Sequence, residues 1–124
     1  MQRKLHFLET LGRNKRVLFC SLLTNGASAP ATTKTNSGSV TRTGVGQYTW
    51  TLSDPAGYCI YAHAELTNPT TKLIRAFITP PALGATSVVI TCATGDATGT
   101  ATEQAAASNR AVYAILVFDE ALNA

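Results

Sequence analysis

Large apolar residues alternate with polar ones at short intervals along the chain. Tyr48, Trp50 and Leu52 fall on one face of an extended segment, with polar residues on the other face. A period of two predicts a half-buried β-strand. The glycines of Gly44-Val45-Gly46, just before this segment, permit a tight turn because glycine tolerates positive φ angles. Residues 39–53 are therefore predicted to form a β-hairpin.

Further strands are predicted where β-branched, aromatic or aliphatic residues are bounded by Gly, Pro, Asn or Asp. These segments are Val17–Leu23, Tyr58–Leu66, Leu73–Thr79, Val88–Ala93 and Ala111–Phe118. With the hairpin they make seven short strands, which predict two packed sheets because a single open sheet would leave an apolar face in water. The expected fold class is all-β, a two-sheet β-sandwich or jelly-roll-like domain.

Three segments do not fit the strand pattern. Met1–Leu11 has three leucines at helical spacing and is compatible with a short amphipathic helix or with an extended arm. Ala101–Ser108 is alanine-rich and is compatible with a helical turn or an ordered loop. Ala27–Gly38 contains small polar residues and is expected to be an exposed linker. The predicted organisation is a basic arm or short helix at residues 1–16 and a single β domain at residues 17–124.

Composition and charge narrow the function classes. Of the 124 residues, 45% are hydrophobic and 14% are charged, whereas ordinary soluble domains have roughly 25% charged residues. Much of the surface must therefore be Thr, Ser, Ala, Gly and Asn, which favours β-rich virion or extracellular modules over cytosolic enzymes. Residues 1–16 carry five basic and one acidic side chain, while the rest of the chain is nearly neutral. Such a basic segment is typical of a solvated end, or of an arm that docks on acidic protein or nucleic acid.

Three cysteines, Cys20, Cys59 and Cys92, lie in apolar runs without the spacing of metal ligands. We interpret them as buried free thiols, with one disulfide and a leftover thiol as the alternative. Free thiols are consistent with maturation in a reducing cytoplasm. No run approaches the ~18 apolar residues of a membrane span, so no membrane partner is expected.

No set of convergent catalytic groups stands out. His6 and His63 lack a second ligand at metal-binding spacing, and Gly44-Val45-Gly46 lacks the third glycine of a dinucleotide loop. Residues 94–99 offer a single carboxylate, too few for a calcium site. We therefore expect no enzyme activity, with no catalytic residue, no metal, no cofactor and no small-molecule substrate.

Aromatic residues near Arg42 raise a nucleic-acid alternative. Tyr48, Trp50, Tyr58 and Tyr61 could stack on bases if their rings were exposed beside a basic groove. However, Tyr48 and Trp50 alternate with threonines as core residues do, and the body lacks positive charge. Core packing is the favoured interpretation, nucleic acid is an unlikely partner, and a single-stranded nucleic-acid-binding β-barrel remains an alternative.

Three passages together resemble small virion proteins of tailed bacteriophages. They are the basic start Met1–Lys4, the hairpin Ser39–Leu52 and the closing segment Asn109–Phe118. The resemblance implies a capsid decoration or cement protein, a compact β module that oligomerises and bridges capsomers while a terminal arm reaches across the shell. It implies the major capsid protein and further copies of this chain as partners, in a dimer or trimer. The implied location is the capsid exterior of the virion, after synthesis in the host cytoplasm.

The residues expected to bind this partner lie in the basic arm. Its cations would contact acidic grooves and its apolar side chains would provide buried area. The predicted set is Arg3, Lys4, Leu5, Phe7, Leu8, Leu11, Arg13, Lys15 and Arg16. A tail or fibre-associated module that recognises host-surface glycans through Trp50 or Tyr58 is a further alternative.

Overall fold

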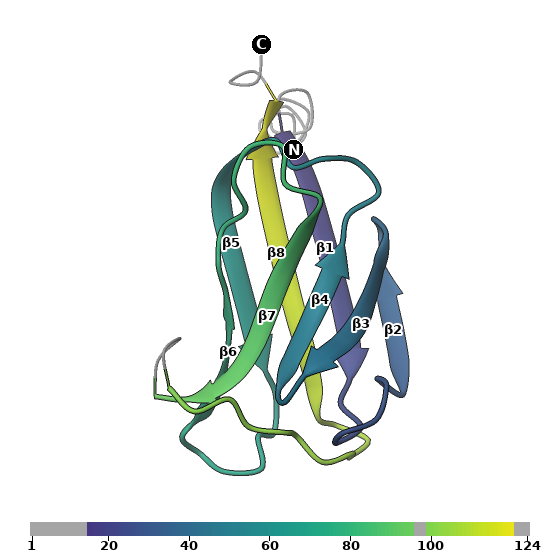
Figure 1. Cartoon of the computed structure of the whole chain (residues 1–124), viewed down its shortest axis with the longest axis vertical. Helices are drawn as coiled ribbons and strands as arrows, with labels where there is room; N and C mark the ends of the chain where they lie inside the picture. Colours follow the sequence, from purple (N-terminus) through teal and green to yellow (C-terminus); the bar gives the residue numbers. More distant parts are fainter. Residues whose placement is uncertain (1–14, 96–98, 121–124) are drawn as a thin grey trace, which may run out of the picture.

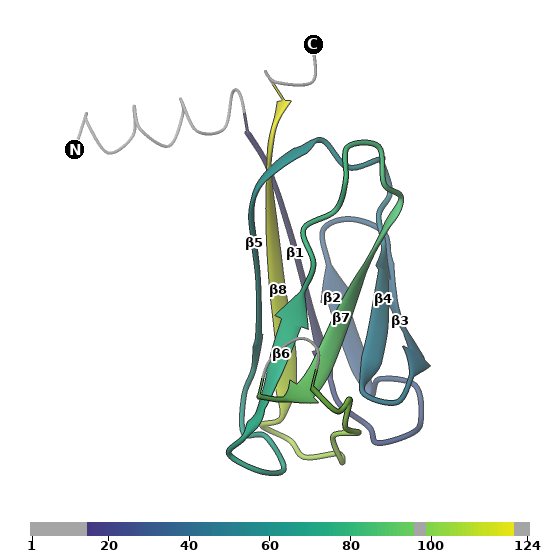
Figure 2. The same ribbon diagram turned by 60° about the vertical axis from the view of Figure 1, so that its left-hand side comes forward.

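The computed structural model describes residues 15–95 and 99–120. In these ranges the chain forms two four-stranded antiparallel sheets that pack face to face (Figure 1). Sheet A has the strand order β2-β1-β8-β5, and sheet B has the order β3-β4-β7-β6. In the turned view of Figure 2, β5, β8 and β1 form one layer, and β7, β4 and β3 belong to the other. The predicted all-β, two-sheet sandwich is confirmed.

Seven of the eight strands match the predicted segments to within two residues at either end. Sheet A contains β1 (Lys15–Leu23), β2 (Thr32–Thr35), β5 (Tyr58–Leu66) and β8 (Ala111–Asp119). Sheet B contains β3 (Ser39–Gly44), β4 (Gln47–Thr51), β6 (Ile74–Ile78) and β7 (Ser87–Thr94). The predicted hairpin is the β3–β4 pair.

The strand β2 lies inside the segment that was expected to be only a linker. Most of that segment is exposed, but its threonines pair with the second half of β1. The side chain of Asn36 continues the pairing, accepting a hydrogen bond from the Phe19 amide at 2.9 Å and donating one to the Val17 carbonyl at 3.0 Å. The linker prediction is wrong for these four residues because threonine is polar enough for a loop and β-branched enough for a strand.

The core lies between the sheets and is built by the alternating residues of each strand. Tyr48 and Trp50 of β4 are 1% and 0% exposed, and Leu52, which directly follows the strand, is 6% exposed, so the predicted inward face is confirmed. Leu116 and Phe118 of β8 meet them from sheet A and are fully buried. Burial of each large apolar side chain contributes roughly 1.5–3 kcal/mol, so these residues dominate the stability of the sandwich.

Residues 99–110, which precede β8, form an ordered loop at one end of the sandwich. The predicted helical turn at Ala101–Ser108 does not form, and the loop alternative is the one observed. Gln104 is fully buried there. Its main-chain carbonyl accepts a hydrogen bond from the Gly26 amide, and its side-chain oxygen accepts one from the Thr70 amide, both at 2.9 Å. These bonds to two other loops override the high helix propensity of the alanines, because tertiary contacts commonly outweigh local propensity.

Candidate functional site

The outer face of sheet A is apolar, although it points away from the core. Val17 and Phe19 of β1 are 40% and 50% exposed, and Tyr61 of β5 and Tyr113 of β8 are 52% and 51% exposed. Ile115 and Val117 lie between them on β8 and are partly exposed. We call these six residues the apolar face.

Strand register brings these side chains together. Across β1, β8 and β5 they form three successive rows, namely Val17, Val117 and Tyr61; Phe19, Ile115 and His63; and Ser21, Tyr113 and Glu65. The small side chain of Ser21 leaves a hollow of about 370 Å³, lined on its other sides by aromatic, aliphatic and carboxylate groups of the second and third rows. The face therefore offers both a flat apolar area and a depression that accepts a projecting side chain.

The outer face of sheet B, in contrast, carries mainly polar side chains on β3 and β4. It is lined by threonines of β3 and β4, which are Thr41, Thr43, Thr49 and Thr51. The hydroxyl oxygens of Thr43 and Thr49 are 2.9 Å apart, so a cross-strand hydrogen bond joins them. Val89 is the large apolar side chain exposed among them, at 44%. The contrast between the two faces shows that exposed large apolar side chains are gathered on the outer face of sheet A and not on that of sheet B.

Two polar side chains of β5, His63 and Glu65, lie at the edge of the apolar face. Nε2 of His63 lies 3.9 Å from Oε2 of Glu65, and these side chains are 55% and 69% exposed. The imidazole also stacks on Tyr61, with ring centroids 6.4 Å apart. His63 and Glu65 thus share the outer face of β5.

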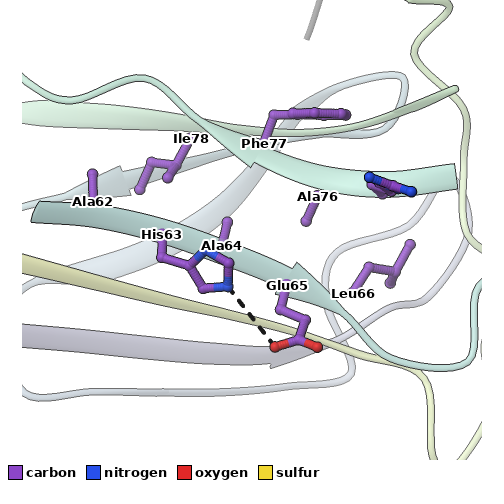
Figure 3. A pocket seen from close by; sticks show the side chains of 9 residues that line it. Ala62, His63, Ala64, Glu65, Leu66, Ala76, Phe77 and Ile78 are labelled. Atoms are coloured by element: carbon purple, nitrogen blue, oxygen red, sulfur yellow. Dashed lines mark ion pairs between the residues drawn. The ribbon is translucent and has the colours of Figure 1, made fainter. Parts of the chain in front are cut away.

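A groove lies along the seam between the sheets, where β5 faces β6 (Figure 3). Its volume is about 530 Å³, and it is lined by residues 62–66 and 75–78. Ala62, Ala64 and Leu66 point toward β6, whereas His63 and Glu65 point away from the groove. Because two of the inward residues are alanines, the side chains leave the seam open.

Of the predicted partner-binding residues, two are in the part of the chain that the structure describes. Lys15 and Arg16 belong to β1, which begins two residues before the expected domain boundary. Nζ of Lys15 lies 3.2 Å from the Asp119 carboxylate. Arg16 pairs with Glu120 and lies over the Phe118 ring, 4.9 Å from its centroid. Both cations are therefore paired within the domain and help to fasten β1 to β8.

The other seven predicted residues, Arg3, Lys4, Leu5, Phe7, Leu8, Leu11 and Arg13, lie outside the described residues. Their role stays a prediction. What the structure adds is their point of attachment, because residues 1–14 lead directly into β1, the strand that carries Val17 and Phe19.

The aromatic residues considered for base or glycan stacking are divided between the two sheets. Tyr48 and Trp50 are buried in the core, so Trp50 is unavailable to a glycan or a base. Arg42 forms an ion pair and a hydrogen bond with Glu103. Tyr58 and Tyr61 are exposed on sheet A, in the other layer. The proposed stacking platform beside Arg42 is therefore not assembled.

The cysteine side chains are free thiols in the described structure. Burial raises the pKa of Cys20 and of Cys92 to about 12, and both match the predicted buried thiols. Cys59 is partly buried; burial raises its pKa, and a backbone hydrogen bond with Tyr61 opposes this effect. Because the thiolate is the nucleophilic form, these raised pKa values disfavour nucleophilic chemistry at all three positions.

Neither a metal-ligand cluster nor a membrane-spanning helix is found in residues 15–95 and 99–120. No group of three or more His, Cys, Asp or Glu side chains in those ranges is arranged to hold a metal ion. Nor does any helix there have the length and apolar character needed to cross a membrane.

Sequence reasoning missed the apolar face, although a signal for it was present. Val17 and Phe19 in β1, and Tyr113, Ile115 and Val117 in β8, are large apolar residues in the phase that should be polar on a solvated face. Both faces of β1 and β8 are therefore apolar: one face packs in the core, and the other forms the surface most suited to binding.

No protein-family model, curated protein or solved structure matches the chain.

Proposed function

We propose that this protein is a structural virion protein that attaches to the outer capsid surface through the apolar face of sheet A, as a decoration or cement protein. The observation that supports binding is the contrast between the apolar face and the threonine-lined face of sheet B. The assignment to a capsid rests on the resemblance of the hairpin, the basic start and the closing strand to virion proteins of tailed phages.

The chemistry of the apolar face suits a protein partner. Contiguous exposed apolar residues are uncommon on monomers and mark interaction sites. Phe and Tyr are enriched at the centres of protein interfaces, where they form the residues that contribute most to affinity. The hollow beside Ser21 can accept a projecting side chain of the partner, with Phe19 and Tyr113 packing around it.

The basic arm adjoins this face and would extend the contact. Residues 1–14 directly precede β1, the strand that carries Val17 and Phe19, so we propose that the arm and the apolar face bind the same partner. A standard interface buries about 1,600 Å² in total. Many copies on one lattice would multiply a modest contact through effective concentration.

The test is co-sedimentation of the purified protein with capsids assembled in its absence. We expect Phe19→Ser combined with Tyr113→Ser to weaken capsid binding at least tenfold, because two central aromatic contacts are lost. Val89→Ser is the matched control, since it removes an apolar side chain of similar exposure from sheet B, and it should bind like the unaltered protein.

Three results would refute parts of this proposal. Unchanged capsid binding by the Phe19→Ser, Tyr113→Ser variant would show that the apolar face is not the docking surface. Images of assembled particles that show this chain only at the tail would exclude the decoration role. Deletion of residues 1–14 should lower capsid occupancy, and unchanged occupancy would exclude the arm from the interface.

A further inference from the structure

The outer edge of β5 differs from the other three sheet edges. An edge strand presents unpaired backbone N–H and C=O groups that can pair with another chain. β2 has four residues and β6 has five, and β3 contains a register shift between Arg42 and Gly44. β5 has nine residues, and after its own register shift it pairs regularly with β8 from Tyr61 to Leu66.

The groove beside this edge can receive the side chains of an added strand. Residues that point into it from β5 and β6 include three alanines, Ala62, Ala64 and Ala76. A strand paired with β5 would direct alternate side chains toward this space and the others toward the outer face of sheet A. The seam thus offers the backbone groups at the edge of β5 for pairing and an apolar groove for the side chains of the added strand.

We propose that β5 pairs with β5 of a second copy of this chain, antiparallel about a two-fold axis at Ala64. In a symmetric antiparallel pair, a residue that precedes the central residue by a given number of positions lies opposite the residue that follows it by the same number in the second copy. Centring the pair on Ala64 places His63 opposite Glu65 of the second copy, and the same contact occurs twice. On the groove side, Ala62 lies opposite Leu66 of the second copy.

Complementarity between the carboxylate of Glu65 and the imidazole of His63 favours this register over its neighbours. A pair centred on Glu65 would set two carboxylates opposite each other, which is destabilising. A pair centred on His63 would set two imidazoles opposite each other and would place Glu65 opposite Tyr61 of the second copy. The Ala64 register instead matches each carboxylate with an imidazole and sets the larger Leu66 against the small Ala62.

The proposed dimer has one continuous eight-stranded sheet. Both outer faces of sheet A then lie on the same side, because a two-fold axis perpendicular to the sheet keeps each face on its side. The dimer presents two apolar faces side by side. This inference stands on the β5 edge and does not require the proposed capsid role.

Sedimentation equilibrium of the full chain over a range of concentrations tests the dimer. The unaltered protein should show a concentration-dependent monomer–dimer equilibrium. Glu65→Lys should weaken the dimer about tenfold, because it replaces two favourable cross-strand pairs by unfavourable ones. Combining it with His63→Glu exchanges the two charges and should restore dimerisation.

Both side chains are more than half exposed, so these variants should fold normally, as circular dichroism can verify. Lys34→Glu is the control, since it makes a charge change on β2, at the opposite edge of sheet A. Hydrogen exchange locates the dimer interface, because the amides of residues 61–66 should become more protected as the protein concentration rises. A monomer at all concentrations, a dimer that Glu65→Lys leaves intact, absence of rescue by the charge exchange, or protection elsewhere would each overturn the proposal.

Discussion

The indole nitrogen of Trp50 donates a hydrogen bond to the main-chain carbonyl oxygen of Ser37 at 2.8 Å. Trp50 is fully buried on β4, and Ser37 lies where the chain passes from β2 in sheet A to β3 in sheet B. The hydroxyl of Ser37 also accepts a hydrogen bond from the Ser53 amide at 3.0 Å. The largest core side chain thus anchors a connection between the two sheets.

Trp50→Phe should therefore cost more stability than its small change in hydrophobicity suggests. The variant loses side-chain volume in the core and removes one of the two donors to the Ser37 carbonyl, the other being the Thr35 hydroxyl at 2.8 Å. The expected total is about 2–4 kcal/mol in the free energy of unfolding. Urea denaturation measures this loss. Tyr113→Phe, at a half-exposed position, should change stability by less than about 0.5 kcal/mol, and similar losses for the two variants would contradict the anchoring role.

Gly38 should tolerate no side chain, unlike Gly26. Both have positive φ angles, +70° and +60°. A Cβ at Gly38 would lie 1.6 Å from the Thr51 carbonyl oxygen, whereas a Cβ at Gly26 meets nothing within 4 Å. We expect Gly26→Ala to cost about 1 kcal/mol from backbone strain alone, and Gly38→Ala to cost more than about 3 kcal/mol or to prevent folding. Thermal unfolding of both variants decides this, and equal Tm values would count against the packing at Gly38.

Two consecutive residues of β1 provide a test of the alternation. Leu18 is 5% exposed and faces the core, whereas Phe19 is 50% exposed on the apolar face. Leu18→Ala should lower the free energy of unfolding by about 2–5 kcal/mol. Phe19→Ala should lower it by less than about 1 kcal/mol, although Phe is the larger side chain. Chemical denaturation of dilute protein compares the two, and the reverse order would place β1 in the wrong register.

The buried thiols should make the protein sensitive to alkaline pH. Burial raises the pKa of Cys20 and Cys92 from 9.0 to about 12, so only the unfolded chain ionises these thiols as the pH first passes 9. Stability from the neutral thiols is thus fully present below pH 9 and is lost as the pH rises toward 12.

The free energy of unfolding, measured by urea titration from pH 8 to pH 11, should therefore fall above pH 9. Replacing both cysteines by alanine should flatten the curve between pH 9 and pH 10. The fall above pH 10 should persist, because burial also raises the pKa of Tyr48 from 10.0 to about 12. An unchanged curve in the double variant would show that the thiols do not cause the loss.

Most of the fold could be predicted because its strands obey a simple period. Tyr48, Trp50 and Leu52 mark the inward face of β4 without any knowledge of its partners. β2 could not be found in this way, since its residues are exposed or half-exposed threonines and lysine with no apolar phase. Its pairing depends on the edge of β1 and on Asn36, which are tertiary contacts.

The candidate site was harder to predict than the fold. Charge drew attention to the basic residues at the start of the chain, but Lys15 and Arg16 are occupied by ion pairs with Asp119 and Glu120. The apolar face depends on the register that sets Phe19 of β1 beside Ile115 of β8. Composition and periodicity of single segments carry no information about such neighbours on adjacent strands.

The two outer faces of the sandwich point in opposite directions, so the face proposed to bind a partner is separate from the face that remains in contact with solvent. If sheet A is applied to a support, the threonines of β3 and β4 point into the medium and form the outer coat of the assembly. Substitutions on that side would alter how a coated particle meets its surroundings, including its adhesion and colloidal behaviour, without touching the residues that hold it in place. The same geometry makes the β3–β4 turn, with its exposed Val45, a natural position for displaying an inserted peptide.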